Sequence, residues 1–441
     1  MQSNLLTASI KKSYYKYLSA AFGSALIMCI YCTVDTAVVG HYAGPNGISA
    51  LAIVMPIWTI LYSLGTLTGI GGSILFSTAK GKDNMHQAQQ FFTAALYFTI
   101  IIGVICWLVI WIFEDALLRF FGANEILLPI AKEYLLAIKF IIPLFPLSQL
   151  LAAFLRNDND PILATIAVLS GGIFNIFGDI YFVFTLEMGV FGAGLATAIG
   201  DIITIVILIS HFFSKKNALT IVKVHFVYVK FKAIFVNGFS TFFTDIAMGI
   251  ITILFNRQIL YYAGLDALAV YGVITQLATT VQSSSYCIGQ AAQPLISINY
   301  GAAQFDRVRQ TLKYSLITSL LFGFGWFILI STMPNVFVHI FMSPTENVLA
   351  IAPAIIRIYV LSFLLLPFNI LAAYYFQTIL KPHTSFIFSI MRGLVLSGLF
   401  IILLPLVLGA DYIWFAMLCT EILIAAASAY FIKRYTAQLG K

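Results

Sequence analysis

Residues 91–113 read FFTAALYFTIIIGVICWLVIWIF, a stretch without a single charged side chain. A helix needs about 20 apolar residues to cross the hydrocarbon core of a bilayer, and this stretch is longer than that. Residues 314–338 and 358–380 form two more uncharged stretches of similar length. None of them alternates strictly between apolar and polar residues over about ten positions, as strands of membrane β-barrels do. The three stretches therefore predict membrane-spanning α-helices.

Apolar stretches of this kind recur along the whole chain. Hydrophobic residues make up 61% of the 441 residues and charged residues only 9%, and the mean hydropathy is +0.97. We expect twelve spans, centred near residues 25, 62, 102, 145, 172, 200, 246, 280, 325, 364, 395 and 422. The sequence thus predicts an all-α integral membrane protein with twelve transmembrane helices.

Basic residues gather in alternate connections between these spans. Most of the 24 Lys and Arg residues precede the first span, follow an even-numbered span or close the chain, whereas Arg119 stands alone in the intervening loops. Lys and Arg are enriched in cytoplasmic loops, so we expect both termini in the cytoplasm. The polar start of the chain leads directly into the first span, and we expect no cleaved signal peptide. The net charge of +7 then reflects topology, and its dispersal over loops argues against nucleic-acid binding.

The two halves of the chain repeat each other at an offset of about 220 residues. Residues 41–44 (HYAG) correspond to residues 261–264 (YYAG), and Pro161 corresponds to Pro382. Because six spans is an even number, both halves enter the membrane in the same direction. They are parallel repeats related by a pseudo-two-fold axis, with a substrate path expected between them. We expect a six-helix lobe over residues 1–215, a cytoplasmic linker over 216–231 and a second six-helix lobe over 232–441.

Polar side chains lie inside the spans of the first lobe. Asp35 is at the far end of the first span, Asn175 and Asp179 are four residues apart in the fifth, and Thr197 and Asp201 repeat this spacing in the sixth. Residues four apart share one helix face. An ionisable group inside a bilayer costs on the order of 2.5 kcal/mol or more, so those that persist usually act on ions, protons or charged substrates. Their oxygen atoms suit a hard monovalent cation or a shared proton. The alternative is a hydrogen-bond network that only packs the helices together.

The second lobe carries fewer buried charges. Asp245 lies in the middle of the seventh span, where we expect a role in cation recognition, and Glu421 in the last span is open to either interpretation. Lys139 and Arg392 could pair with nearby acids or line a cavity. Aromatic residues make up 15% of the chain. An aromatic cavity with a few carboxylates would suit bulky organic cations.

Several of these polar residues belong to motifs that resemble those of the multidrug and toxic compound extrusion (MATE) family over essentially the whole chain. The motifs are Val34-Asp35-Thr36 with Gly40, Asn175 with Asp179, Thr197, Gln290 with Gln293-Pro294 and Asn299-Tyr300-Gly301-Ala302, and Tyr375-Phe376-Gln377. The order in which they occur is more specific than any one of them.

The resemblance implies an antiporter with two six-helix lobes that works by alternating access. It exports organic cations or drugs while H⁺ or Na⁺ enters. The coupling residues become Asp35, Asn175, Asp179 and Thr197, which would also hold Na⁺ if Na⁺ is the coupling ion. The substrate-cavity candidates are Asp245, Asp201 and Asn369. Two departures concern the mechanism. Many relatives have a Pro in the first span that is tied to a proposed bending of that helix, and this chain has none there. Some relatives have an acidic residue in the tenth span at the position of Asn369.

We therefore expect a monomeric multi-pass transporter in the bacterial inner membrane, with cationic amphipathic substrates and no cofactor other than the coupling ion. A flippase for lipid-linked oligosaccharide or peptidoglycan precursors is the alternative. Such a protein would line its cavity with Arg and Lys to bind phosphate, whereas the deep charges here are mainly Asp. Export of one endogenous metabolite is a third possibility. An integral membrane enzyme fits poorly, because the chain has no HExxH metal motif and no GxSxG nucleophile in its required setting.

Overall fold

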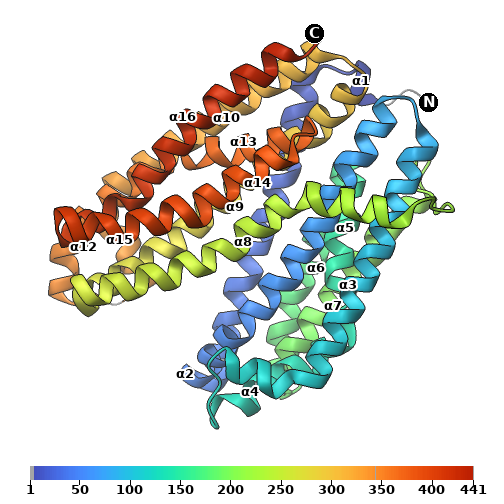
Figure 1. The fold of residues 1–441 in the computed structure, drawn as a ribbon. Helices are drawn as coiled ribbons and strands as arrows, with labels where there is room; N and C mark the ends of the chain where they lie inside the picture. The colour runs from blue at the N-terminus through green and yellow to red at the C-terminus, as the bar shows by residue number, and fades with distance from the viewer. Residues whose placement is uncertain (1–3, 343, 441) are drawn as a thin grey trace. The chain divides into compact units, whose positions relative to one another are not determined.

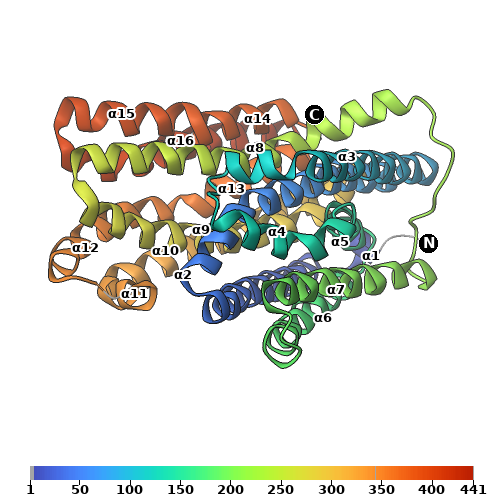
Figure 2. The ribbon, with the colours of Figure 1, turned by 90° about the horizontal axis from the view of Figure 1, so that it is seen from below.

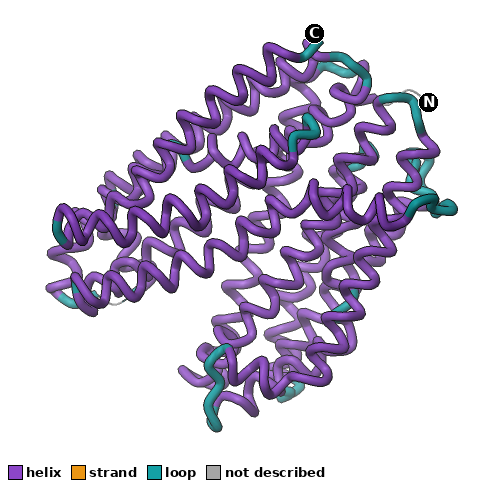
Figure 3. The backbone as a smooth tube through the Cα atoms, in the orientation of Figure 1, coloured by secondary structure: helices purple, strands orange, loops and turns teal. Residues whose placement is uncertain are grey.

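The computed structural model describes residues 4–342 and 344–440, and every regular element in these ranges is a helix (Figures 1, 2 and 3). The elements before residue 227 are α1 (Asn4–Thr7), α2 (Ile10–Gly81), α3 (Met85–Phe120), α4 (Leu127–Ile138), η1 (Lys139–Ile141), α5 (Leu144–Asn157), α6 (Pro161–Ile180), η2 (Tyr181–Thr185), α7 (Gly189–Ile209) and η3 (Ser210–Phe213).

The elements from residue 227 onward are α8 (Val227–Tyr262), α9 (Gly264–Gly301), α10 (Phe305–Thr332), α11 (Pro334–Phe341), α12 (Glu346–Tyr359), η4 (Val360–Leu364), α13 (Leu366–Thr378), α14 (Pro382–Ile390), η5 (Met391–Val395), α15 (Leu396–Leu408), η6 (Ala410–Phe415) and α16 (Ala416–Gln438). Both α6 and α14 begin with a proline, Pro161 and Pro382, as expected from the repeat. Proline is favoured at the first position of a helix because its missing N–H would have no partner there.

The helices account for the twelve predicted spans. Ten helices among the described residues are long and apolar enough to cross a membrane, and Leu127–Ile141 with Leu144–Asn157 forms a further span that is bent by 55°. Helix α2 is 72 residues long. At 1.5 Å per residue it measures about 108 Å, far more than one bilayer, so it supplies two spans. The predicted all-α membrane fold is confirmed.

The two spans of α2 meet at Gly44. Its backbone angles are φ 63° and ψ −154°, which lie outside the helical region, and Pro45 follows directly. This combination is open essentially to glycine alone, because a Cβ atom would clash with the backbone. Pro45 is compatible with a helix start, since it fixes φ near −65° and needs no hydrogen-bonded N–H there. The Gly44-Pro45 pair therefore breaks the helix without an intervening loop.

The described residues form two compact units. The first contains Ser19–Phe242 together with the residues before Ala8, and the second contains Ala8–Leu18 and the residues from Phe243 onward. The expected linker, 216–231, lies in the first unit; it is loop up to residue 226 and becomes helix α8 at Val227. In the second unit, Arg307 of α10 donates a hydrogen bond from Nη2 to the carbonyl of Ala8 at 2.7 Å, which joins the segment before α2 to α10.

Glycines bring α6 and α7 into close contact within the first unit. A Cβ atom on Gly171 would lie 2.1 Å from Oγ1 of Thr204 and 2.4 Å from the carbonyl oxygen of Gly200. Small residues at helix interfaces allow backbones in a membrane to approach this closely. The contact places the polar side chains of α6 opposite those of α7.

Candidate functional site

The four predicted coupling residues come together inside the first unit. Asp35 lies in α2, nine residues before the break at Gly44, and Asn175 and Asp179 lie on one face of α6. Thr197 faces them from α7, across the close helix contact. The predicted spacing therefore corresponds to a real cluster, which we call the first-unit polar cluster: Asp35, Asn175, Asp179 and Thr197, together with Tyr134 of α4.

A chain of hydrogen bonds joins most of this cluster. The Tyr134 hydroxyl donates to Oδ2 of Asp35 at 3.0 Å and lies 3.5 Å from Oγ1 of Thr197. Nδ2 of Asn175 donates to the same Thr197 oxygen at 3.0 Å. Helices α2, α4, α6 and α7 are thereby linked through side chains inside the apolar interior of the unit.

The cluster also contains acceptor atoms that have no donor. Oδ1 of Asp35, Oδ1 of Asn175 and both carboxylate oxygens of Asp179 are buried without a hydrogen-bond partner among the described residues. The Asp179 side chain is fully buried, and its negative charge is repelled by that of Asp35. Carboxylate and amide oxygens act as hydrogen-bond acceptors, so these four atoms could take up a proton or help to coordinate a small cation.

Tyr134 is a member of this cluster that the sequence did not reveal. It belongs to a packed apolar core with Leu135, Ile138 and residues of α2 and α7, and its side chain is only 3% exposed. It is one of 22 tyrosines, and nothing in its local sequence distinguishes it. The Tyr134 hydroxyl reaches Asp35 because of the way α4 is rotated against α2, which the sequence does not reveal.

Asp201 lies one turn beyond Thr197 in α7 but has a different partner. It is in hydrogen-bonding contact with Ser148 of α5, and its Oδ2 atom has no partner among the described residues. No hydrogen bond joins it to the first-unit polar cluster. Lys139 lies just before the bend of the fourth span and forms an ion pair of 2.5 Å with Glu114, which is one of the two roles expected for it.

In the second unit, Asp245 of α8 accepts a hydrogen bond from the Tyr286 hydroxyl at 2.9 Å. Tyr286 in turn accepts one from Nε2 of Gln282 at 2.8 Å. Gln282 lines a pocket in this unit, so Asp245 is connected to that pocket through two intervening side chains.

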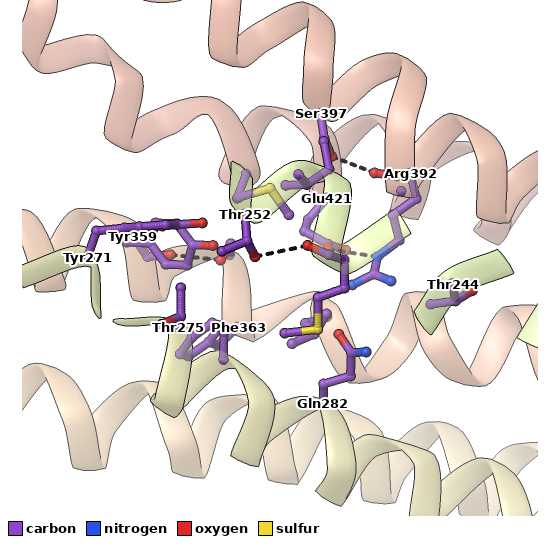
Figure 4. A pocket seen from close by; sticks show the side chains of 17 residues that line it. Thr244, Thr252, Tyr271, Thr275, Gln282, Tyr359, Phe363, Arg392, Ser397 and Glu421 are labelled. Carbon is purple, nitrogen blue, oxygen red and sulfur yellow. Dashed lines mark hydrogen bonds and ion pairs between the residues drawn. The ribbon is translucent and has the colours of Figure 1, made fainter. Parts of the chain in front are cut away.

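The pocket contains a buried ion pair (Figure 4). Nε of Arg392 lies 2.8 Å from Oε1 of Glu421, and Nδ2 of Asn369 donates to Oε2 of Glu421 at 2.6 Å. Asn369 therefore fixes the carboxylate of Glu421, although it is not itself one of the residues that line the pocket. The expected pairing of Arg392 with a nearby acid is confirmed, and Glu421 is that acid. The described residues contain no group of three or more His, Cys, Asp or Glu side chains that could hold a metal ion.

The sequence matches a known protein family and several known proteins. The family model described as MatE matches residues 20–181 and 240–406. The multidrug export protein MepA of Staphylococcus saprophyticus is 24% identical and the match covers 92% of this chain and 89% of that protein. The probable multidrug resistance protein YoeA of Bacillus subtilis is 26% identical, with 81% and 79% covered.

Solved structures resemble the fold over its full length. An outward-facing multidrug resistance MATE family transporter of the MOP superfamily superimposes with a TM-score of 0.91 at 19% identity, covering 99% of this chain and 98% of that one. A MOP superfamily transporter from Pyrococcus furiosus, described as having a binding pocket of reverse polarity, gives a TM-score of 0.90 at 19% identity, with the same shares covered.

Proposed function

Because this chain belongs to the MatE family of transporters, we propose that it is a multidrug efflux antiporter that exports organic cations in exchange for H⁺ or Na⁺. The names of MepA and YoeA support the drug-export part of this proposal. The observation that carries the exchange part is the set of four buried oxygen atoms without a donor in the first-unit polar cluster.

The cluster can bind an ion through charge neutralisation. Asp35 and Asp179 repel each other when both are charged, and a bound H⁺ or Na⁺ removes this repulsion. The amide oxygen of Asn175 supplies a further, uncharged ligand, and Tyr134 keeps the second oxygen of Asp35 occupied. Ion binding would draw α2, α4, α6 and α7 together, and ion release would let them separate.

Competition for the same charge couples the ion to the substrate. A cationic substrate is attracted by ionised Asp35 and Asp179, and a bound proton or Na⁺ cancels this attraction. A conformational change can be driven only by a ligand with different affinities for two states. Here the ion would stabilise the state that has released the substrate. Inward movement of the ion would then drive outward movement of the substrate by alternating access.

The remaining parts of the proposal concern placement. The protein is a multi-pass membrane protein, and its bacterial relatives support a bacterial membrane. We place both termini in the cytoplasm because the basic residues collect on that side. We also propose that the transporter is monomeric.

Transport by the purified protein in liposomes tests this function. A fluorescent organic cation such as ethidium is added outside, and an inside-acidic pH gradient or an outward Na⁺ gradient is imposed in separate experiments. We expect one gradient to drive accumulation of the dye, and that gradient names the ion. If neither gradient moves the dye while labelled anionic lipid-linked precursors cross the bilayer, the protein is a flippase and the proposal is wrong.

A further inference from the structure

The connection from η3 to α8 is both basic and apolar. Residues 213–232 contain five lysines and no Asp or Glu. Only Lys216 forms an ion pair, with its Nζ 3.1 Å from Oδ1 of Asp160, and the other four lysines have no ion-pair partner in the part of the chain that the structure describes. Among them, Phe226 is 82% exposed and Tyr228 is 78% exposed. A surface of this composition fits a partner that is both anionic and apolar.

The inner side of this connection is fixed to the first unit. The backbone N–H of Ala218 donates a hydrogen bond of 2.7 Å to Oδ2 of Asp158. Leu219 is buried in an apolar core with residues of α3 and α5, and Val224 packs against the same core. The connection therefore follows the body of the unit, and only its other side is available to a partner.

Contacts with α3 place the connection at the edge of the membrane. It passes the end of α3 (Figure 2), where the backbone N–H of Val222 donates to Oγ1 of Thr93 at 3.1 Å. The ring of Phe231 stacks on that of Phe98, with the centroids 4.8 Å apart. Both α3 residues lie near the start of the uncharged stretch 91–113, whose 23 residues measure about 34 Å and so match a hydrocarbon core of about 30 Å. The connection beside this start therefore lies at the level of the lipid headgroups.

The first turns of α8 continue the same surface. Tyr228, Lys232 and Phe235 are spaced four and three residues apart, so they share one helix face, and all three are exposed. Lys230 lies with its Nζ 4.9 Å from the centroid of the Phe91 ring. Its aliphatic part covers apolar surface while its charged end stays among polar groups, as is usual for lysines at the edge of a membrane.

Anionic phospholipids match both properties of this surface. Lysines directly beside a membrane span are attracted by anionic headgroups, and aromatic side chains are enriched at the headgroup level. An acidic soluble protein would match the charge alone. It would leave the exposed aromatic side chains at membrane depth without a partner.

We propose that this surface binds anionic phospholipids of the leaflet that it faces, which is the cytoplasmic one in the topology proposed above. We call it the linker surface, and it consists of Ile221, Lys223, Phe226, Tyr228, Val229, Lys230 and Lys232. The lysines contact the phosphate groups, and the aromatic and aliphatic side chains lie between the headgroups and the first part of the acyl chains. The inference requires a chain that spans a membrane, and it is independent of the proposed antiport.

A tryptophan at position 228 reports which lipid the linker surface contacts. Tyr228→Trp is introduced into the full-length protein, and the signal of the five natural tryptophans is subtracted with the wild type. The protein is reconstituted in vesicles of equal parts phosphatidylglycerol and phosphatidylcholine, with bromine on the acyl chains of one lipid or of the other. Bromine quenches tryptophan fluorescence on contact. The ratio of quenching by the two brominated lipids therefore measures which lipid is enriched at position 228.

We expect brominated phosphatidylglycerol to quench the added tryptophan about twofold more than brominated phosphatidylcholine. The ratio should fall to about one when Lys223→Gln, Lys230→Gln and Lys232→Gln are combined with Tyr228→Trp, because the charges that select the headgroup are gone. It should fall in the same way in about 1 M salt, where electrostatic attraction is screened within about 3 Å. Lys433→Gln with Arg434→Gln is the matched control, since both residues are exposed in α16 of the second unit, and it should leave the ratio unchanged.

Three results would overturn the proposal. Absence of quenching by either brominated lipid would mean that the surface faces water and is open to a soluble partner. Equal quenching by both lipids would mean that it contacts the membrane without selecting anionic headgroups. A ratio that the triple lysine variant does not change would mean that these lysines do not bind the phosphate groups. If that variant does not fold, the salt dependence of the Tyr228→Trp protein carries the test.

Discussion

Tyr134 and Asp35 are 99 residues apart in the chain, and the Tyr134 hydroxyl donates a hydrogen bond of 3.0 Å to Oδ2 of Asp35. This is the hydrogen bond that connects α4 to the acidic residue of α2. Oδ1 of Asp35 has no hydrogen-bond partner among the described residues, and the proposed exchange would use this atom to bind the ion. The tyrosine would then act on the proposed coupling residue without carrying a charge itself.

Replacing Tyr134 by phenylalanine removes this hydrogen bond and keeps the aromatic ring in the apolar core. A hydrogen bond to a charged group contributes about 1.5–3 kcal/mol, so we expect gradient-driven ethidium transport to fall by about tenfold or more. Tyr430→Phe is the matched control, since Tyr430 is 60% exposed. Equal transport rates for Tyr134→Phe and the wild type would show that Tyr134 plays no part in coupling.

Gly44 is expected to tolerate alanine poorly because of its backbone conformation. Alanine at this position is strained because φ is +63°, which costs of order 1–3 kcal/mol. We expect Gly44→Ala to lower the midpoint of thermal unfolding in detergent. Gly249→Ala serves as the control, because Gly249 lies inside α8 with open space around it and alanine favours a helix. A Gly44→Ala protein as stable as Gly249→Ala would mean that the break between the two spans does not require glycine.

A second group of buried charges ties the loop after η3 to the rest of the first unit. Asp158 accepts from Lys80 at 2.5 Å, from the backbone N–H of Ala218 at 2.7 Å and lies 2.9 Å from Nε2 of His211. The Asp158 and His211 side chains are fully buried, and Lys80 is nearly so.

Asp158→Asn would leave Lys80 without its counter-charge. Breaking a buried ion pair costs about 3–5 kcal/mol, so we expect a large loss of stability in unfolding by sodium dodecyl sulfate. Asp306→Asn, at the exposed pair with Arg309, should cost less than about 1 kcal/mol. If the two variants unfold alike, the Asp158 cluster does not hold the loop in place.

The sequence predicted the spans because their length depends only on how many apolar residues follow one another. It also placed Asn175, Asp179 and Thr197 together, since residues four apart share a helix face and the glycines of α6 favour close packing. It did not predict Tyr134, because that contact depends on how α4 is rotated against α2. Helical spacing carries information about one helix, and not about the rotation of its neighbour.

The second unit also has features that could not be predicted from the sequence. Arg392 and Glu421 were both recognised as buried charges, and pairing was one of two expected roles for Arg392. Their distance of 2.8 Å is a property of the packed structure. The π-helical turn η5 that carries Arg392 was not predicted from the sequence either.

The central claim is that Asp35 and Asp179 together carry the coupling ion, and transport by their asparagine variants tests it most directly. Wild type, Asp35→Asn, Asp179→Asn and the exposed control Asp411→Asn are reconstituted at equal density, and ethidium accumulation is followed under the gradient that drives the wild type. Each asparagine keeps the size of the side chain and removes its charge. We expect both cluster variants to lose gradient-driven accumulation and Asp411→Asn to retain it. Undiminished accumulation by either cluster variant would contradict the account.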